Sequence, residues 1–261
     1  MKIVFLGAGN LATNLAMALK TRGHEIVQVY SRTEESAEQL ARKTVAEPIT
    51  SLNRLVHDAD LYVLSVKDDA IARVLENFPV HEGFLVHTAG SIPMDVLKGY
   101  AARYGVIYPL QTFSKERLVD FNTIPVCLEA SGSSDLAFLE ELMSDLSANI
   151  YHIDSRQRGY IHVAAVFACN FSNFMMAMAQ DILQEHDMPF DIMAPLIQET
   201  VEKAIENTPV PSQTGPAIRG DQQTMERHLK LLAGSDKLQN LYRFVSNTIS
   251  NYYTSDQQGQ Q

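Results

Sequence analysis

A glycine-rich hexapeptide near the amino terminus has the spacing of a phosphate-binding turn. The residues read Gly-Ala-Gly-Asn-Leu-Ala from position 7 to position 12 and directly follow an apolar run. The first glycine permits a tight turn, the second lets a pyrophosphate approach the backbone because it has no Cβ, and Ala12 allows a helix to pack closely on a strand. A helix that begins here offers free N–H groups and a partial positive charge to an anion. The pattern predicts a dinucleotide site that uses Gly7, Ala8, Gly9, Asn10 and Leu11; the alternative is a turn with a structural role only.

The end of the second predicted strand indicates which dinucleotide is bound. An NAD site usually places an acidic residue there, roughly 20 residues after the glycines, to bind the ribose 2′-hydroxyl. This chain has Ser31, Arg32 and Thr33 instead. An acid would repel a 2′-phosphate, whereas a guanidinium and hydroxyl groups would bind one. The prediction is NADP(H); the alternative is a solvated Arg32 and a Thr33 that only caps a helix.

Two further segments follow apolar strands, where ligands of parallel sheets bind. They are Val66-Lys67 and His87-Thr88-Ala89-Gly90, and all but His87 are predicted to border the cofactor. Lys67 could contact ribose or phosphate, or it could be an ordinary surface lysine. His87 could exchange the proton that accompanies hydride transfer, which makes it a candidate catalytic residue. The alternative is a buried histidine bonded to a backbone carbonyl.

The longest predicted helix carries polar side chains at the edge of an apolar face. His162, Val166, Asn170 and Asn173 recur at helical spacing and form one stripe. Buried imidazoles and amides need hydrogen-bond partners, and a substrate or a cofactor carboxamide would supply them. We therefore consider His162 and Asn170 candidate catalytic residues; hydrogen bonding between helices is the alternative.

A fourth candidate, Arg219, belongs to the loop Thr-Gly-Pro-Ala-Ile-Arg-Gly-Asp that starts at position 214. Its guanidinium could bind a substrate carboxylate through two parallel hydrogen bonds. The alternatives are an ion pair with Asp221 or with a helix end. Gly215-Pro216 and Gly220 are expected to form the turns of the loop, and Asp221 is expected to cap the next helix.

Strands and helices alternate along the first part of the chain and would position these residues. Apolar runs predict strands at Lys2–Leu6, Glu25–Tyr30, Leu61–Val66, Phe84–His87 and Val106–Tyr108. Amphipathic segments predict helices at Asn10–Arg22, Thr33–Lys43, Asp68–Asn77 and Ile92–Arg103. Pro125–Leu128 and Asn149–Ile153, around a helix at Ser134–Leu146, are expected to extend the sheet. This alternation is typical of the α/β class, with a doubly wound, mainly parallel sheet covered on both faces.

The second part of the chain shows helical patterns and no strand pattern. Helices are predicted at Arg156–Met188, Asp191–Asn207, Asp221–Ala233 and Ser235–Tyr253, with a proline- and glycine-containing loop from Thr208 to Asp221. Loops of this length inside helical domains are often functional. We expect a Rossmann domain at residues 1–154 and an all-α substrate and dimerisation domain at residues 155–261.

Several of these segments resemble known families. The glycine turn, Ser31-Arg32-Thr33, Leu64-Ser65-Val66-Lys67-Asp68-Asp69 and His87-Thr88-Ala89-Gly90-Ser91 resemble pyrroline-5-carboxylate reductases and deazaflavin-dependent NADP oxidoreductases. The segment from Tyr108 to Ser114 and the Arg219 loop resemble a narrower group, bacterial Rossmann-like NADP oxidoreductases with a helical C-terminal domain. The resemblance implies an NAD(P)-binding Rossmann fold, an NADP cofactor and a homodimer formed through the helical domain.

The chain departs from these families at two points. The narrower group often has a histidine where this chain has Tyr108, which puts proton transfer at that position in doubt. The related β-hydroxyacid dehydrogenases carry a catalytic lysine on the long helix, but no lysine occurs between Lys115 and Lys203. Their mechanism is therefore not expected, and His162 is the nearest substitute acid.

Composition and charge exclude several other classes. The chain has 31 acidic against 21 basic residues, and a net charge of −10 repels nucleic acid. Its two cysteines, 42 positions apart, suit a reducing cytoplasm, and its eight histidines show no metal-binding spacing, so no metal is expected. The apolar run before the glycine turn is too short for a signal peptide, and no stretch approaches the roughly 20 apolar residues of a membrane span. Ser31-Arg32-Thr33 argues against S-adenosylmethionine or FAD as the ligand.

The sequence thus predicts an NADP-dependent oxidoreductase. We expect it to transfer a hydride between NADPH and a small C=N or C=O substrate in the interdomain cleft, as a cytoplasmic homodimer without nucleic-acid or membrane partners. The alternative is a non-catalytic NADP-binding or sensor protein with a degenerate active site, which the missing lysine and Tyr108 would favour.

Overall fold

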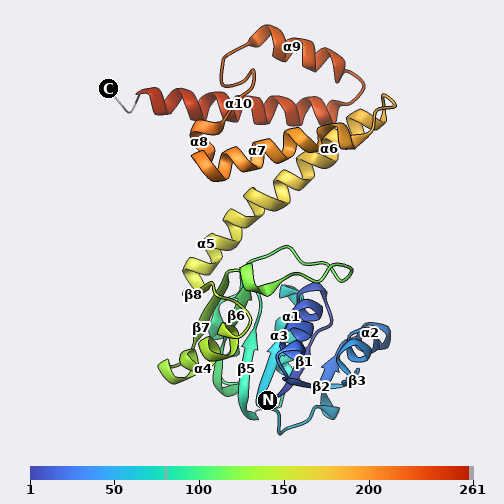
Figure 1. Cartoon of the computed structure of the whole chain (residues 1–261), viewed down its shortest axis with the longest axis vertical. Coiled ribbons are helices and arrows are strands. Elements are labelled where there is room, and N and C mark those ends of the chain that lie inside the picture. The colour runs from blue at the N-terminus through green and yellow to red at the C-terminus, as the bar shows by residue number, and fades with distance from the viewer. Residues whose placement is uncertain (80, 259–261) are drawn as a thin grey trace. The chain divides into compact units, whose positions relative to one another are not determined.

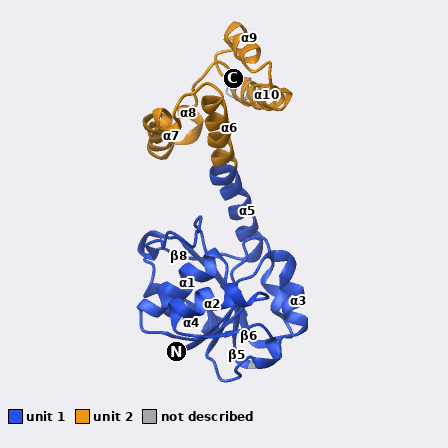
Figure 2. Ribbon diagram, turned by 90° about the vertical axis from the view of Figure 1, so that its right-hand side faces the viewer, with its two compact units in different colours: residues 1–170 blue, residues 171–261 orange. Residues whose placement is uncertain are grey.

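The chain forms two compact units, residues 1–170 and residues 171–261 (Figure 2). The structure is a computed structural model that describes residues 1–79 and 81–258. The predicted domain boundary after residue 154 precedes the long helix, whereas the two units divide within it.

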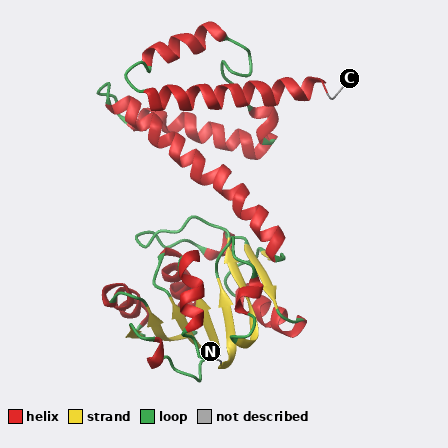
Figure 3. Cartoon of the chain, turned by 180° about the vertical axis from the view of Figure 1, so that it is seen from behind, coloured by secondary structure: helices red, strands yellow, loops and turns green. Residues whose placement is uncertain are grey.

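One eight-stranded sheet organises the first unit, in the order β3-β2-β1-β4-β5-β6-β7-β8 (Figures 1 and 3). All neighbouring strands are parallel except β6 and β7, which are antiparallel. The sheet extension through β7 and β8 is therefore confirmed. The strands are β1 (Lys2–Leu6), β2 (Glu25–Tyr30), β3 (Glu47–Ile49), β4 (Leu61–Leu64), β5 (His81–His87), β6 (Ala101–Pro109), β7 (Val126–Ala130) and β8 (Ile150–His152).

Both faces of the sheet are covered, as the apolar strands predict. Alternate residues of β1 belong to different core clusters: Ile3 and Phe5 to one, Val4 and Leu6 to the other. The first cluster includes apolar residues of α1 (Asn10–Thr21), α2 (Glu34–Thr44) and α4 (Ser133–Ser144), and the second includes those of α3 (Ile71–Glu76). Side chains of a strand point alternately to opposite faces, so a strand without polar residues must be buried on both.

The helix predicted at Ile92–Arg103 is wrong. Only a short 3₁₀ helix occurs there, at Met94–Leu97, and Ala101 already begins β6. Gly99 adopts φ +91°, a left-handed conformation that interrupts a right-handed helix. The short edge strand β3 was not predicted, and the segment predicted as a helix from Asp68 begins as a 3₁₀ turn before α3.

The second unit is helical throughout its described residues, as expected. Its helices are α6 (Ser172–Gln184), a 3₁₀ turn (Phe190–Met193), α7 (Ala194–Asn207), α8 (Pro209–Ser212), α9 (Gln222–Leu231) and α10 (Asp236–Gln258). The short helix α8 lies inside the segment that was predicted as a loop. The long predicted helix is present as α5 (Ser155–Ala165), a π-helical segment (Val166–Phe171) and α6.

The long helix also corrects one expectation about apolar segments. Residues Ser155–Gln184 form one helix of 30 residues with a window of mean hydropathy 1.4, long and apolar enough to cross a membrane by length and composition. Counting uninterrupted apolar residues misses it, because Asn170, Ser172 and Asn173 interrupt the run. None of the window is buried within the chain.

Candidate functional site

The glycine turn between β1 and α1 has the geometry of a phosphate-binding turn. Gly7 adopts φ +124°, and a Cβ there would lie 2.0 Å from the carbonyl oxygen of Ser65. Its N–H donates to the Tyr30 carbonyl at 2.8 Å, so the turn is tied to the end of β2. Only glycine fits this position without moving the backbone.

Gly9, in contrast, faces open space. It occupies the N-cap position of α1, and a Cβ there would meet no atom within 4 Å. No side chain caps the first turn of α1, so its N–H groups are open to an anion. Ala12 is fully buried in the core beneath. The residues present therefore fit a dinucleotide pyrophosphate.

The loop between β6 and β7 is attached to the start of α1. Asn10 donates through Nδ2 to the Phe113 carbonyl at 2.9 Å, and Asn14 donates to the Ser114 carbonyl at 2.8 Å. The Asn14 side-chain oxygen accepts the Val119 N–H at 3.1 Å. These bonds join a segment some 100 residues later to the glycine turn, a link that the sequence pattern did not indicate.

The residues predicted to select NADP follow the end of β2, where Ser31 is half-buried and Arg32 and Thr33 are exposed. Ser31 is bonded through its N–H to the Ile49 carbonyl at 3.1 Å. Arg32 is exposed and forms no ion pair within the described residues. Thr33 occupies the N-cap position of α2, but its hydroxyl donates to Ser36 Oγ at 2.9 Å instead of capping the helix. The guanidinium and two hydroxyls remain accessible to a phosphate.

The predicted cofactor residues of three strands share one edge of the sheet. Leu6, Leu64 and His87 are in register across β1, β4 and β5, so the residues that follow them meet at the carboxyl ends. Thr88 Oγ1 donates to Ser65 Oγ at 3.1 Å across this edge. Val66 is half-buried and Lys67 is exposed there. The prediction that these segments lie at a common carboxyl edge is confirmed.

His87 is fully buried and neutral. Its Nδ1 accepts the Ala89 N–H at 3.2 Å, and its Nε2 has no hydrogen-bond partner among the described residues. Burial lowers the His87 pKa from 6.5 to about 4, assisted by the positive charge of Arg158 and opposed by the Pro93 backbone. This geometry supports a structural histidine more than a proton donor, and the predicted catalytic role stays a prediction.

Tyr108 and His162 form a hydrogen-bonded pair. Tyr108 Oη lies 3.0 Å from His162 Nδ1, with the rings at 70°. The pair packs on Gly90, where a Cβ would lie 2.5 Å from His162 Nδ1 and 3.0 Å from Tyr108 Cζ. The structure thus joins a residue of β6, a residue of α5 and the loop after β5, which the sequence treats separately.

A buried ion pair anchors α5 to the sheet near this pair. The side chain of Arg158 is 1% exposed; it pairs through Nη1 with Glu129 of β7 and donates through Nη2 to the Ile92 carbonyl at 2.6 Å. Ser155 Oγ donates to Glu129 at 2.8 Å and accepts the Met94 N–H at 2.9 Å. The sequence analysis missed these residues, although a lone glutamate in the apolar strand Val-Cys-Leu-Glu-Ala was an available signal.

The two remaining catalytic candidates lie elsewhere. Asn170 is exposed in the π-helical segment of the long helix. Arg219 is exposed in the second unit and forms no ion pair with the described residues; its charge is one minor cause that lowers the pKa of Asp221, after the hydrogen bonds from Thr224. Asp221 caps α9 by accepting the Thr224 N–H at 3.0 Å, as predicted. Catalytic roles for Asn170 and Arg219 stay predictions.

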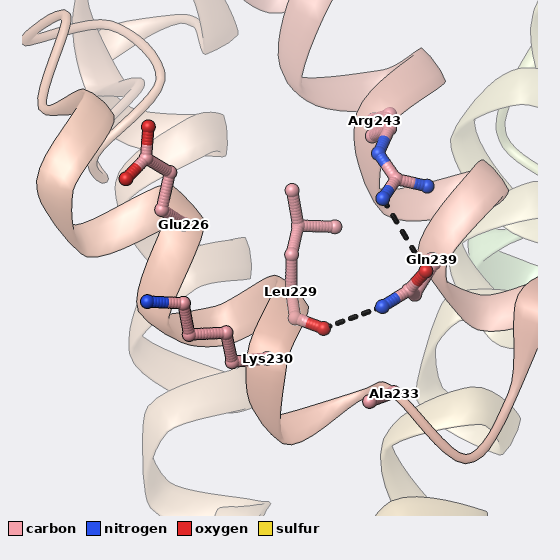
Figure 4. A pocket seen from close by; sticks show the side chains of 6 residues that line it. All are labelled: Glu226, Leu229, Lys230, Ala233, Gln239 and Arg243. Carbon is pink, nitrogen blue, oxygen red and sulfur yellow. Dashed lines mark hydrogen bonds between the residues drawn. The ribbon is translucent and has the colours of Figure 1, made fainter.

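The surface pockets of the two units do not coincide with the predicted catalytic residues. One of about 320 Å³ lies between α9 and α10 (Figure 4), where Gln239 bonds to the Leu229 carbonyl. Another of about 270 Å³ lies between α1 and residues 118–122. Within residues 1–79 and 81–258, no group of three metal-ligating side chains occurs.

Known families match both parts of the chain. The family described as "NADP oxidoreductase coenzyme F420-dependent" matches residues 2–89, and the "Domain of unknown function (DUF2520)" matches residues 124–249. The chain spans only 37% of the length of a curated relative, glutamyl-tRNA reductase from Pyrobaculum islandicum, at 26% identity over 55% of this chain.

Solved structures match over nearly the whole chain. A Bacteroides fragilis protein named "putative NADP oxidoreductase" is 50% identical, with 96% of this chain and 98% of that chain covered and a TM-score of 0.92. An imine reductase from Myxococcus stipitatus in complex with NADP⁺ is 16% identical (99% and 95% covered, TM-score 0.65). A 1-pyrroline-5-carboxylate reductase from Streptococcus pyogenes is 15% identical (96% and 98% covered, TM-score 0.62). The last two show the fold alone.

The similarity to the Bacteroides fragilis relative is not limited to the glycine turn, because it covers both parts of the chain. The predicted fold and the prediction of NADP(H) as the cofactor are confirmed by this relationship. The chain belongs to the NADP oxidoreductase family of that relative, with an N-terminal domain of the type described as coenzyme F420-dependent.

Proposed function

We propose that this protein is a reductase that uses NADPH to reduce a small C=N or C=O compound. The observation that carries the proposal is the first turn of α1, whose N–H groups are not capped by a side chain. Gly9, at the start of this turn, faces open space. The turn lies at the edge of the sheet that β1, β4 and β5 share. Imine and pyrroline-5-carboxylate reductases share the fold, and their names suggest the substrate class.

Different residues at this edge would bind different parts of the cofactor. The N–H groups of the α1 first turn would hold the pyrophosphate, and Ser31, Arg32 and Thr33 would hold the 2′-phosphate. Ala89 and Gly90 would border the nicotinamide half. When bound, the cofactor supplies the hydride, so the chain itself must orient the substrate and provide a proton.

We also propose that the protein acts as a homodimer in the cytoplasm. Large apolar side chains are exposed along the long helix and in the second unit, and a second copy would cover them. The most exposed include Tyr160, Phe167, Ile205, Leu231 and Phe244, with fractions from 65% to 81%. Both cysteines are free, which suits a reducing compartment.

The test is a parallel titration with NADPH and NADH, read by the melting temperature. A ligand at 100 times its dissociation constant stabilises the native state by about 2.7 kcal/mol. We expect NADPH to bind more tightly, and Arg32→Ala to weaken NADPH about 10-fold or more while leaving NADH unchanged, because a hydrogen bond to a charged group contributes about 1.5–3 kcal/mol.

The matched control is Arg42→Ala at the opposite end of α2, where Arg42 pairs with Glu38 on the surface. It removes the same charge at a site away from the end of β2 and should leave NADPH affinity unchanged. A chain that binds neither dinucleotide is not the proposed reductase. One that binds NADPH but oxidises it with no imine or keto acid is the non-catalytic binding protein or sensor.

A further inference from the structure

The proposed reductase needs a proton donor, and the structure narrows the choice. His87 is buried and neutral, Asn170 carries no acidic proton, and Arg219 was predicted to bind a substrate carboxylate and not to release a proton. Tyr108 of β6 and His162 of α5, by contrast, are hydrogen-bonded to each other beside the loop that follows β5. A Cβ on Gly90 of that loop would lie 2.5 Å from His162 Nδ1 and 3.0 Å from Tyr108 Cζ.

The position of Tyr108 follows from the register of the sheet. His87 of β5 is paired with Val106 of β6, so Tyr108 lies two residues further toward the carboxyl edge. Thr88, Ala89 and Gly90 follow β5 directly and continue past the same edge. Tyr108 therefore belongs to the edge where the dinucleotide-binding residues gather, and it is 8% exposed there.

His162 connects this buried phenol to the surface. It is half-buried, and only its Nδ1 is used in the bond to Tyr108. Four residues earlier on the same face of α5, Arg158 is held by Glu129, Ser155 and the Ile92 carbonyl. The pair therefore rests on a helix that is anchored one turn away.

The charges around the phenol are mixed. Burial raises the Tyr108 pKa above its usual value, and Cys127 and Asp68 raise it further, whereas the Arg158 guanidinium lowers it. Glu129 balances the Arg158 charge, and His87 on the neighbouring strand is neutral. Tyr108 is accordingly protonated before the reaction, as a proton donor must be.

We propose that Tyr108 donates the proton that accompanies hydride transfer and that His162 restores it from solvent, a proposal that rests on the reductase function above. The hydride and its electron pair go to the substrate carbon, and the π electrons of the C=N or C=O bond move to the heteroatom. That atom takes the proton from Tyr108 Oη. As the phenolate takes the Nδ1 hydrogen of His162, His162 Nε2 takes a proton from an acid in the solvent, so the imidazole stays neutral. Proton exchange with solvent then restores the Nδ1–H form.

This proton path requires one arrangement of the hydrogen bond. The phenol hydrogen is free for the substrate only when His162 carries its own hydrogen on Nδ1 and donates it to Tyr108 Oη. If Tyr108 instead donates to a bare Nδ1, its hydrogen is committed to His162, and the pair serves only to pack α5 on the sheet. The tautomer of His162 therefore separates the two roles.

The first experiment measures that tautomer in the full chain by ¹⁵N NMR of labelled histidine, with and without NADP⁺; His162→Gln assigns the signal. We expect a protonated Nδ1 in His162, and a change in its shift and titration in Tyr108→Phe. Tyr104→Phe, the same substitution on the same strand, is the control and should change neither. A His162 that carries its hydrogen on Nε2 alone, or that titrates identically in Tyr108→Phe, overturns the proposal.

The second experiment measures NADPH oxidation with the cyclic imine 2-methyl-1-pyrroline. We expect Tyr108→Phe to lower kcat by about 10²- to 10⁴-fold, the usual contribution of a general acid, with NADPH affinity within twofold of the unaltered chain. His162→Gln should lower kcat less and change the pH profile, whereas His152→Gln, on the surface of β8, should change neither. Unaltered kcat in Tyr108→Phe contradicts the proposal.

The failure of the proposed function is distinguishable from failure of the proton path. A chain that binds no NADPH fails the titration described above, whatever the His162 tautomer. If NADPH binds but the imine is not reduced, that substrate is wrong, and the tautomer measurement alone decides the role of the pair.

Discussion

Replacing Glu129 by glutamine should show how strongly the buried ion pair holds α5 on the sheet. The Arg158 side chain is 1% exposed and Glu129 is 16% exposed, so the Arg158 charge is shielded from water and depends on its protein partners. The Arg158 Nε already lacks a hydrogen-bond partner among the described residues. Glutamine retains the shape and one acceptor oxygen but leaves the guanidinium charge without a counter-charge.

The expected cost follows from this burial. Removing one partner of a buried ion pair costs about 3–5 kcal/mol, and the retained hydrogen bond places Glu129→Gln near about 3 kcal/mol. With a urea dependence of about 1–3 kcal/mol per molar, the unfolding midpoint should fall by roughly 1–3 M. Chemical unfolding of the whole chain, followed by circular dichroism, measures this shift.

Glu38→Gln provides the matched control, because the Arg42–Glu38 pair is an exposed i,i+4 pair. Exposed pairs of this kind contribute about 0.3–0.5 kcal/mol. If Glu129→Gln lowers the midpoint no more than Glu38→Gln does, water or another group compensates the Arg158 charge, and the anchoring role assigned to Arg158 is refuted.

Three further predictions concern the edge of the sheet. The pKa of His87 is about 4 in the folded chain against 6.5 in the unfolded chain, so the unfolded chain binds more protons between these pH values. The contribution of His87 to the free energy of unfolding is therefore fully present above pH 6.5 and should fall by about 3 kcal/mol toward pH 4. Urea unfolding across this pH range should show a smaller loss in His87→Gln. Gly7→Ala places a Cβ 2.0 Å from the Ser65 carbonyl oxygen and should abolish NADPH binding in a calorimetric titration, whereas Gly23→Ala, also at positive φ but with open space around it, should retain binding. Asn14→Ala removes two bonds to the loop after β6 and should speed its cleavage by trypsin at Lys115 and Arg117, with Asn77→Ala unchanged.

The fold was predictable where one local signal dominated. Apolar runs identified β1, β2, β4 and β7, because a strand buried on both faces cannot include many polar residues. The edge strand β8 was also predicted, although two of its three residues are exposed. The start of β6 was not predicted, because the apolar residues of Ile92–Arg103 also have helical spacing. Only Gly99, which adopts a left-handed conformation, interrupts a helix there. Short β3 and the π-helical turn have too few residues to carry a pattern.

The site, like the fold, was predictable only where a contiguous motif indicated it. A glycine turn is a contiguous motif, so Gly7 and Gly9 could be given separate roles before the structure was known. The bond between Tyr108 and His162 joins residues 54 positions apart, and no local pattern encodes such a pairing. A missing lysine on the long helix pointed to His162, but it could not show which partner the imidazole would meet.

The four-residue spacing of Arg158 and His162 links the stability of α5 to the chemistry of the edge. Both side chains lie on one face of the helix, and Arg158 is fixed by acceptors from β7, from α5 itself and from the loop after β5. That same loop carries Gly90, on which Tyr108 and His162 pack. We therefore expect a change in the ion pair to affect both the helix and the loop, and with them the hydrogen bond between Tyr108 and His162. The buried ion pair therefore holds the helix and the loop that lie on either side of the Tyr108–His162 hydrogen bond. The hydrogen bonds to Ser155 and to the Ile92 carbonyl help to offset the desolvation of its charges.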